Sequence, residues 1–360
     1  MSVILMGPMA GPALMDALGL RGRTLRLNGR LLGGARAGVE EGGWPCLFAA
    51  DAPLTGVEVM SNGALERYAA VMGLAPQNHE GRAILGISGS GPCNEPPWTD
   101  DSTRDALAAE IARQILEAPA DAEAAQLASR LPMMGTWASS RLRAAAMPPS
   151  GGTVVARRGR DQVRVLEREQ PFRGYFAVER QRLTHVLHQG GQSQPMIREG
   201  FLMGDAVVVL PWDPRRDRVL VIEQFRLAPA LRGDPQPWLL EPIAGRVDPG
   251  ETVEEAALRE AREEADLTIR QLIPCFHAYP SPGAVCEFLY HYVGIADLPD
   301  DVAGIHGLDG EAEDIRGHLM PRDSLSAMVD ARQITNAPLI ALSLWLDARA
   351  GRLRGEPSRT

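Results

Sequence analysis

One stretch constrains the fold of this chain more than any other, and it reads GRVDPGETVEEAALREAREEADL over residues 245–267. Thr252 followed by Glu255 is the pattern of a capping box, and a Pro-Gly turn stands directly before it. The pattern predicts a helix that begins at Val253 and continues to about residue 265. One side of this helix is apolar and can pack on a sheet. That side consists of Val253, Ala257, Leu258 and Ala261.

Three glutamates share the other side of the predicted helix. Glu260, Glu263 and Glu264 stand at i, i+3 and i+4, so their carboxylates lie within one turn on one face. Like charges at this spacing repel by roughly a few tenths of a kcal/mol per pair, and a bound cation would remove that cost. Hard carboxylate oxygens select Mg²⁺ or Mn²⁺. A glutamate-rich helix can equally be a solvated face with salt bridges, so the acids alone do not decide.

The spacing of the residues around these acids is more specific. The pattern consists of Gly245, five residues, Glu251, seven residues and Arg259-Glu260-x-x-Glu263-Glu264. It resembles the Nudix box. One position departs, because Asp266 stands where the family has a glycine that ends the helix in a left-handed turn. Aspartate tolerates that turn better than most residues, so we expect a slightly altered helix end and retained chemistry.

Motifs on both sides of the box narrow the resemblance to one subfamily. From about residue 160 to residue 350 the chain is similar to ADP-ribose pyrophosphatases. The similar segments are 204–207, 223–226, 237–241 with 244–245, 281–283, Glu287, 304–308, 311–315 and 336–338. The resemblance implies Mg²⁺-dependent hydrolysis of the diphosphate of ADP-ribose to AMP and ribose 5-phosphate, on an α/β/α sandwich.

The resemblance also implies roles for individual residues. The metal ligands would be the Ala244 carbonyl and the carboxylates of Glu260, Glu264 and Glu313. Three residues would take part in catalysis: Glu311 as general base, Glu263 and Arg259. Arg259 and Glu251 are placed to orient the acids. The substrate contacts would be Pro282, Glu287 and Arg226, whose guanidinium can grip a phosphate through two N–H groups.

Two alternatives stay open within this resemblance. The same acids would serve a Nudix hydrolase of another nucleoside diphosphate compound, such as an ADP-sugar or NADH. A sensor that binds ADP-ribose without hydrolysing it is the other alternative, although every acid of the box is retained.

Residues 1 to about 80 resemble the γ-glutamylcyclotransferase-like fold. The resemblance rests on residues 6–9 (MGPM), on Trp44-Pro45 and on residues 65–68 (LERY). Ala69 stands where active members place a catalytic glutamate, so the resemblance implies a non-catalytic module, with γ-glutamyl cyclotransfer as a further alternative. A fusion of this module with a Nudix domain is similar to bacterial tellurite-resistance Nudix proteins, although no residue here suggests tellurium chemistry.

Three segments follow from these patterns, and the expected fold class is α+β or α/β. Residues 1–95 form a small β-rich cyclotransferase-like domain, 96–150 a helical segment and linker, and 151–360 the Nudix α/β/α sandwich. Stretches rich in Gly, Pro and Ser at 87–100 and 147–152 mark the boundaries. Short apolar runs predict strands at 162–166, 175–183, 206–209 and 219–222, and two helices broken at Pro119 are expected within 103–131.

Charge and composition limit the partners. The net charge is −9 and there is no basic tail, so binding of nucleic acid is not expected. All 37 basic residues are arginine, which excludes a Schiff-base or phosphate-binding lysine. No apolar run is long enough to span a membrane, and the N-terminus lacks the basic start of an export signal. The four scattered cysteines fit a reducing compartment, so we expect a cytoplasmic protein and, by analogy with the family, a homodimer.

Overall fold

The computed structural model describes residues 1–88, 94–149, 151–154, 157–307 and 314–355. Contacts divide the chain into two compact units, residues 1–159 with 173–176 and residues 160–172 with 177–360. Within the described ranges, no helix is both long and apolar enough to cross a membrane.

The first unit is built on a sheet whose strands follow the order β2-β3-β1-β5-β4. The strands are β1 (Ser2–Met6), β2 (Gly22–Leu32), β3 (Cys46–Met60), β4 (Ala75–His79) and β5 (Arg82–Ser88). The helical elements are η1 (Gly7–Ala10), α1 (Pro12–Ala17), α2 (Gly63–Val71), α3 (Ser102–Glu117), α4 (Ala124–Ala128) and α5 (Leu131–Ala146). One apolar core joins Leu5 of β1, Tyr68 of α2, Ile111 of α3 and Met134 of α5. Helices from the predicted 96–150 segment therefore share a core with strands from residues 1–95.

The second unit contains a mixed sheet that follows the order β12-β13-β8-β9-β15-β14. The strands are β6 (Val163–Arg173), β7 (Ala177–His185), β8 (Met196–Asp213), β9 (Arg218–Phe225), β10 (Trp238–Glu241), β11 (Ile243–Arg246), β12 (Gln271–Ala278), β13 (Val285–Ile295), β14 (Ile305–His306) and β15 (Ile315–Pro321). Strand β13 runs parallel to β8, whereas β10 and β11 pair antiparallel with β9 and β8. The short strands β10 and β11 are thus adjacent in sequence, but each pairs with a different strand of the sheet.

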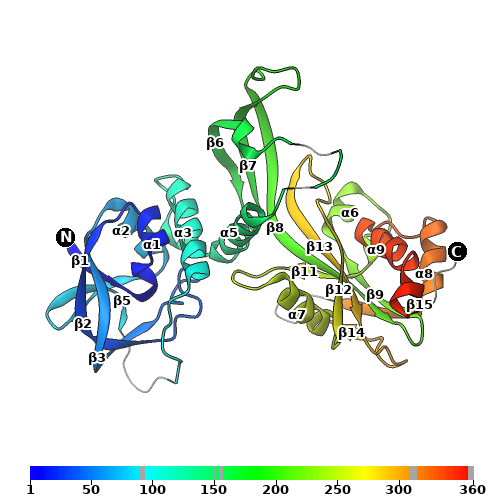
Figure 1. Cartoon of the computed structure of the whole chain (residues 1–360), viewed down its shortest axis with the longest axis horizontal. Helices are drawn as coiled ribbons and strands as arrows, with labels where there is room; N and C mark the ends of the chain where they lie inside the picture. Colours follow the sequence, from blue (N-terminus) through cyan, green and yellow to red (C-terminus); the bar gives the residue numbers. More distant parts are fainter. Residues whose placement is uncertain (89–93, 150, 155–156, 308–313, 356–360) are drawn as a thin grey trace. The chain divides into compact units, whose positions relative to one another are not determined.

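Helices cover both faces of this sheet (Figure 1). The helical elements of this unit are η2 (Arg160–Gln162), α6 (Leu227–Arg232), α7 (Val253–Ala265), α8 (Arg322–Asp330), α9 (Ala337–Asp347) and α10 (Ala350–Leu353), of which α7 to α10 pack on the sheet. Val207 and Ile222 pack with Ala257 and Ala261 of α7 on one face. On the other face Val208 and Val221 pack with α8 and α9, as alternation along a strand requires. The predicted α/β/α sandwich and the mixed fold class are confirmed.

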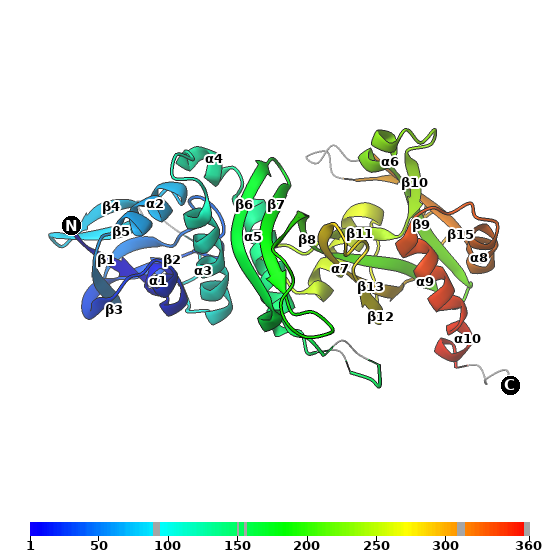
Figure 2. The same cartoon turned by 90° about the horizontal axis from the view of Figure 1, so that it is seen from above.

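Strands β6 and β7 extend the sheet beside the first half of β8 (Figure 2). Strand β7 pairs with β8 from Ala177–Leu202 to Leu183–Met196, and β6 pairs with β7. Several apolar side chains of this extension are exposed, including Val163, Val165 and Ile197.

His291 on β13 makes the stability of the second unit depend on pH. Its side chain is 3% exposed and stacks on Phe276 at 4.2 Å between ring centroids. Burial lowers the pKa of His291 to about 4. The folded form therefore disfavours the proton that the unfolded chain binds below about pH 6.5, so unfolding becomes easier as the pH falls from there to about 4. The expected loss approaches roughly 3 kcal/mol.

Urea unfolding at pH 7, 5.5 and 4.5 measures this loss, with His291→Phe as the comparison. The variant should show a clearly smaller dependence over this range. An unchanged dependence would show that other groups cause it.

Candidate active site

Helix α7 brings the predicted acids to one face of the sheet. It spans Val253–Ala265, the predicted range, and its capping box is formed: Glu255 N–H donates to Thr252 Oγ1 (3.2 Å) and Thr252 N–H to Glu255 Oε2 (2.9 Å). The helix ends at Asp266, whose φ of 49° and ψ of 36° are left-handed. The left-handed turn is thus formed with aspartate in place of glycine, rather than the slightly altered helix end that we expected.

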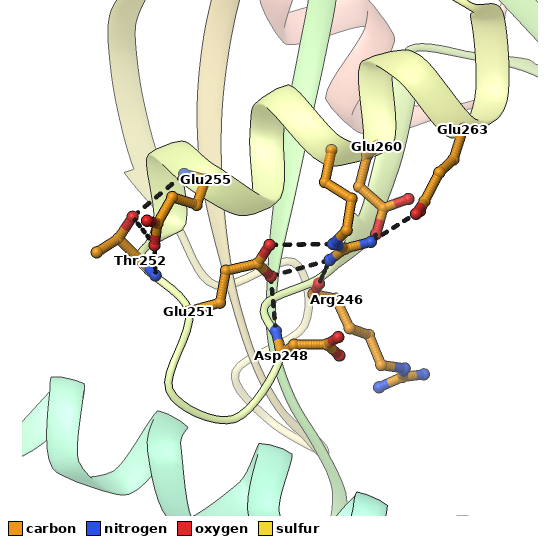
Figure 3. Close-up of polar contacts among 8 residues, drawn as sticks. Arg246, Asp248, Glu251, Thr252, Glu255, Glu260 and Glu263 are labelled. Atoms are coloured by element: carbon orange, nitrogen blue, oxygen red, sulfur yellow. Dashed lines mark hydrogen bonds and ion pairs between the residues drawn. The ribbon is translucent and has the colours of Figure 1, made fainter. Parts of the chain in front are cut away.

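Arg259 lies at the centre of the acidic face and pairs with Glu251, Glu260 and Glu263, which Figure 3 labels. Its Nε and Nη2 donate to the two oxygens of Glu251 at 3.0 Å each, and Nη1 donates to Glu260 (2.7 Å) and Glu263 (2.9 Å). Nη2 also donates to the backbone oxygen of Arg246 at 2.9 Å. These contacts match the five N–H groups of a guanidinium, so Arg259 is suited to orient the acids, as the sequence suggested.

The charges of this cluster do not balance. Counted over the described residues alone, the ion pairs of this cluster set one guanidinium against three carboxylates, and Glu264 on the same helix adds another negative charge. Burial alone would lower the pKa of Arg259, but its hydrogen bond to Glu251 and the charge of Glu260 raise that pKa well above its usual value. This excess of negative charge, with Glu260 and Glu264 buried, is suited to a divalent cation.

Gly245 and Glu260 fit together closely. A Cβ placed on Gly245 would lie 1.8 Å from Glu260 Oε1, so only glycine leaves room for this carboxylate. Glu260 is 9% exposed and lies directly over strand β11. The glycine of the motif therefore has a steric function here.

Ala244 and Glu264 meet at the edge of β11. The Ala244 N–H donates to Glu264 Oε2 at 3.0 Å, and Glu264 is 3% exposed. Ala244 pairs with Val208 on β8, but its N–H points away from that strand. In an antiparallel pair the carbonyl of such a residue points to the same outer edge as its N–H, toward the acids.

A second group of polar residues surrounds Arg226. Its Nε and Nη2 donate to Glu241 Oε2 at 2.8 and 2.7 Å. Gln224 and Asn336 also donate to Glu241, at 3.3 and 3.1 Å. The Glu241 side chain is 6% exposed and that of Arg226 is 41% exposed. The arginine thus rests on a buried carboxylate and reaches toward solvent.

The pKa of Glu287 on β13 is shifted by burial and by the charges of nearby residues. Burial raises the pKa of Glu287; Arg246 and Arg226 act to lower it, and Asp205 raises it further. Arg246 itself donates to the Met203 carbonyl at 2.7 Å, and its side chain points away from the Arg259 cluster (Figure 3). Two predicted substrate contacts, Arg226 and Glu287, are therefore electrostatically coupled.

The structure says less about the other predicted site residues, Pro282, Glu311 and Glu313. Pro282 is exposed in the turn between β12 and β13. Glu311 and Glu313, the predicted base and fourth metal ligand, lie outside the described residues. Among the residues that are described, no three acidic, histidine or cysteine side chains are arranged to hold a metal ion. The metal set predicted from sequence has only Glu260 and Glu264 as carboxylates within these ranges.

Sequence reasoning did not assign roles to Glu241 and Arg246. A signal for Glu241 exists, because this acid interrupts an otherwise apolar stretch at 238–244 (WLLEPIA) and a buried acid needs partners. Arg246 carries no comparable signal, since an arginine at the end of a strand is ordinarily a surface residue.

Comparison with known proteins agrees with this geometry. Residues 203–342 match the model of the NUDIX domain, a range that includes α7, β11 and Arg226. The chain is 39% identical over 198 residues to the ADP-ribose pyrophosphatase of Escherichia coli (strain K12). The matched residues cover 55% of this chain and 94% of the relative. The chain belongs to the Nudix family.

Two further relatives are similar to part of the chain. The ADP-ribose pyrophosphatase of Haemophilus influenzae is 34% identical, with 53% of this chain and 89% of the relative covered. The GDP-mannose pyrophosphatase of Yersinia enterocolitica is 30% identical, with 36% and 68% covered. The Nudix assignment thus rests on the second unit.

Proposed function

We propose that this Nudix protein hydrolyses ADP-ribose to AMP and ribose 5-phosphate with the help of Mg²⁺ or Mn²⁺. The observation that carries the proposal is the array of Glu251, Glu260, Glu263 and Glu264 around Arg259. The 39% identity to an ADP-ribose pyrophosphatase over nearly all of that relative supports the substrate.

The residues present fit a divalent cation. Glu260 and Glu264 would hold it with the Ala244 carbonyl, because both carboxylates are buried and the local charge is negative. Glu313 completes the proposed set, and Glu311 remains the proposed general base. When bound, such an ion neutralises charge on the diphosphate and lowers the pKa of a water molecule.

The chain's own residues supply orientation and binding. Arg259 fixes the carboxylates of Glu251, Glu260 and Glu263 through its hydrogen bonds. Arg226 binds the diphosphate through its outward edge, since a guanidinium pairs bidentately with phosphate oxygens. In the overall reaction, water adds to one phosphorus, the bond from that phosphorus to the bridging oxygen breaks, and both products leave as monophosphates.

AMP release from a panel of compounds tests the proposal. The purified protein is incubated with Mg²⁺ and ADP-ribose, ADP-glucose, NADH or GDP-mannose, and nucleoside monophosphate is measured. Preferred turnover of ADP-ribose is the expected result. The GDP-mannose pyrophosphatase relative makes a nucleotide sugar the second candidate, which preferred turnover of a sugar nucleotide would favour. Binding of ADP-ribose without hydrolysis of any compound would favour a sensor.

We also propose that the first unit is non-catalytic. Ala69 is 6% exposed and packs in the core of this unit, so it offers only a methyl group where cyclotransfer would require a carboxylate. No 5-oxoproline should be released from a γ-glutamyl amine. Its release would overturn this part of the proposal.

A homodimer is the proposed assembly. The exposed Val163, Val165 and Ile197 on β6 and β8 provide apolar surface that a second copy could cover. Sedimentation should give twice the mass of one 38.9 kDa chain, and Val165→Glu should shift it toward one chain. A single-chain mass for the unmodified protein would contradict the proposal.

A further inference from the structure

Glu241 is a buried acid at the end of β10 that no role in the reaction yet explains. Glu241 is 4% exposed. Removing a carboxylate from water costs several kcal/mol unless hydrogen bonds and opposite charges compensate for the lost hydration. The compensation comes from three residues: Arg226 follows β9, Gln224 lies within β9, and Asn336 precedes α9.

The contacts at Glu241 fix the orientation of one guanidinium. Arg226 presents Nε and Nη2 to the same carboxylate oxygen, at 2.8 and 2.7 Å. The guanidinium is planar with donors in fixed directions, so two bonds on one edge define its plane and leave the Nη1 edge directed away from Glu241. Most of the exposed surface of this ion pair belongs to the arginine, at 41% against 6% for the carboxylate.

Both oxygens of the Glu241 carboxylate, which contacts Arg226, accept further hydrogen bonds. Gln224 Nε2 donates to Glu241 Oε2, whereas Asn336 Nδ2 donates to the other oxygen, Oε1. Asn336 also accepts the Leu339 N–H at 2.9 Å as the N-cap of α9. A single residue, Pro242, separates Glu241 from β11, the strand of Ala244 and Gly245. One carboxylate therefore links the arginine to the strand that carries the proposed metal site.

We infer that Glu241 is a positioning residue that orients Arg226 toward the diphosphate of the substrate. The inference rests on the proposed function, in which Arg226 binds that diphosphate. The energetic reason is that an arginine held in one orientation loses less rotational freedom when the phosphate binds. Removing the negative charge of Glu241 should leave Arg226 in place on average but free to rotate.

Kinetics of Glu241→Gln test the inference. Glutamine keeps the size and one acceptor oxygen, so the fold should be retained, and a thermal unfolding scan checks this. We expect kcat/KM for ADP-ribose to fall roughly 10- to 100-fold, mainly through a higher KM. Asn336→Ser keeps a capping oxygen for α9 but removes the amide donor to Glu241, so a smaller loss in the same direction is expected.

A double-mutant cycle separates positioning from a merely structural role. In an Arg226→Ala background, Glu241→Gln should reduce kcat/KM by less than about threefold, because the residue through which it acts is gone. Equal losses in the presence and absence of Arg226 would overturn the inference. Asp297→Asn, which removes an exposed partner of Arg215 and Arg216, is the matched control and should leave kcat/KM unchanged.

A binding measurement distinguishes this inference from the proposed function. Inorganic diphosphate is titrated calorimetrically into the metal-free protein, where no turnover occurs. Glu241→Gln should weaken its binding roughly tenfold. If ADP-ribose is not hydrolysed but this weakening is observed, the proposed function fails and the role of Glu241 stands. If the unmodified protein does not bind diphosphate, or the variant binds it equally well, the role of Glu241 is wrong.

Discussion

Glu264→Gln should reduce kcat for ADP-ribose hydrolysis by roughly 10³-fold, since losing one charged ligand removes several kcal/mol of electrostatic stabilisation. The Glu264 carboxylate is 3% exposed and accepts the Ala244 N–H at 3.0 Å. Glutamine can accept the same hydrogen bond through its amide oxygen, so the local fold should survive while the charge is lost. AMP release at saturating substrate and metal measures the effect.

The matched control is Glu254→Gln on the same helix. Glu254 accepts a hydrogen bond from Tyr292 at 3.0 Å and belongs to none of the contacts around Arg259. It should therefore leave kcat within about threefold of the unmodified protein. Turnover by Glu264→Gln at the level of this control would refute the proposed metal site.

Asp213→Ala should lower the free energy of unfolding of the second unit by about 3 kcal/mol, because it removes a buried carboxylate that accepts four hydrogen bonds. Asp213 ends β8 and is fully buried. Its Oδ1 accepts the N–H groups of Arg215 and Arg216, and its Oδ2 accepts Arg216 Nη1 and the Leu298 N–H. The alanine would leave these donors without their acceptor. Urea unfolding at pH 7 measures the loss.

The pH dependence of this contribution follows from the same contacts. Burial acts to raise the pKa of Asp213, but the bonds from Arg216, Leu298 and Arg215 outweigh it and lower the pKa to about 2. The stabilisation is therefore present above the unfolded value of about 3.9 and is lost as the pH falls toward 2. Asp297→Asn, the exposed partner of the same Arg216, should change stability much less. Equal losses in both variants would contradict the role of burial.

The sequence predicted the elements whose causes are local. Thr252 and Glu255 define the start of α7, and the spacing of Glu251 from Arg259 indicated their ion pair. Short apolar runs indicated the strands β8 and β9, although β8 extends well beyond the predicted 206–209. Its first half pairs with β7 rather than lying in the core, so its residues lack the apolar signal that marks a buried strand.

Features that depend on tertiary contacts could not be predicted in this way. Helix α5 contains Gly135, Thr136, Ser139 and Ser140, which are weak helix formers, yet all four are buried. Packing within the first unit therefore compensates for low helix propensity. The hydrogen bonds of Glu241 likewise join residues 224, 241 and 336. These residues are far apart in the sequence, so the sequence alone does not show that they are in contact.

The left-handed turn at Asp266 has a consequence for how such proteins are found. Its N–H still closes the helix onto the Arg262 carbonyl at 2.9 Å, and the next residue, Leu267, is buried in the core. The position therefore demands a backbone shape, and glycine is only its commonest solution. A search pattern that insists on glycine there would discard this chain. A pattern that also accepts aspartate and asparagine at this position would retain this chain.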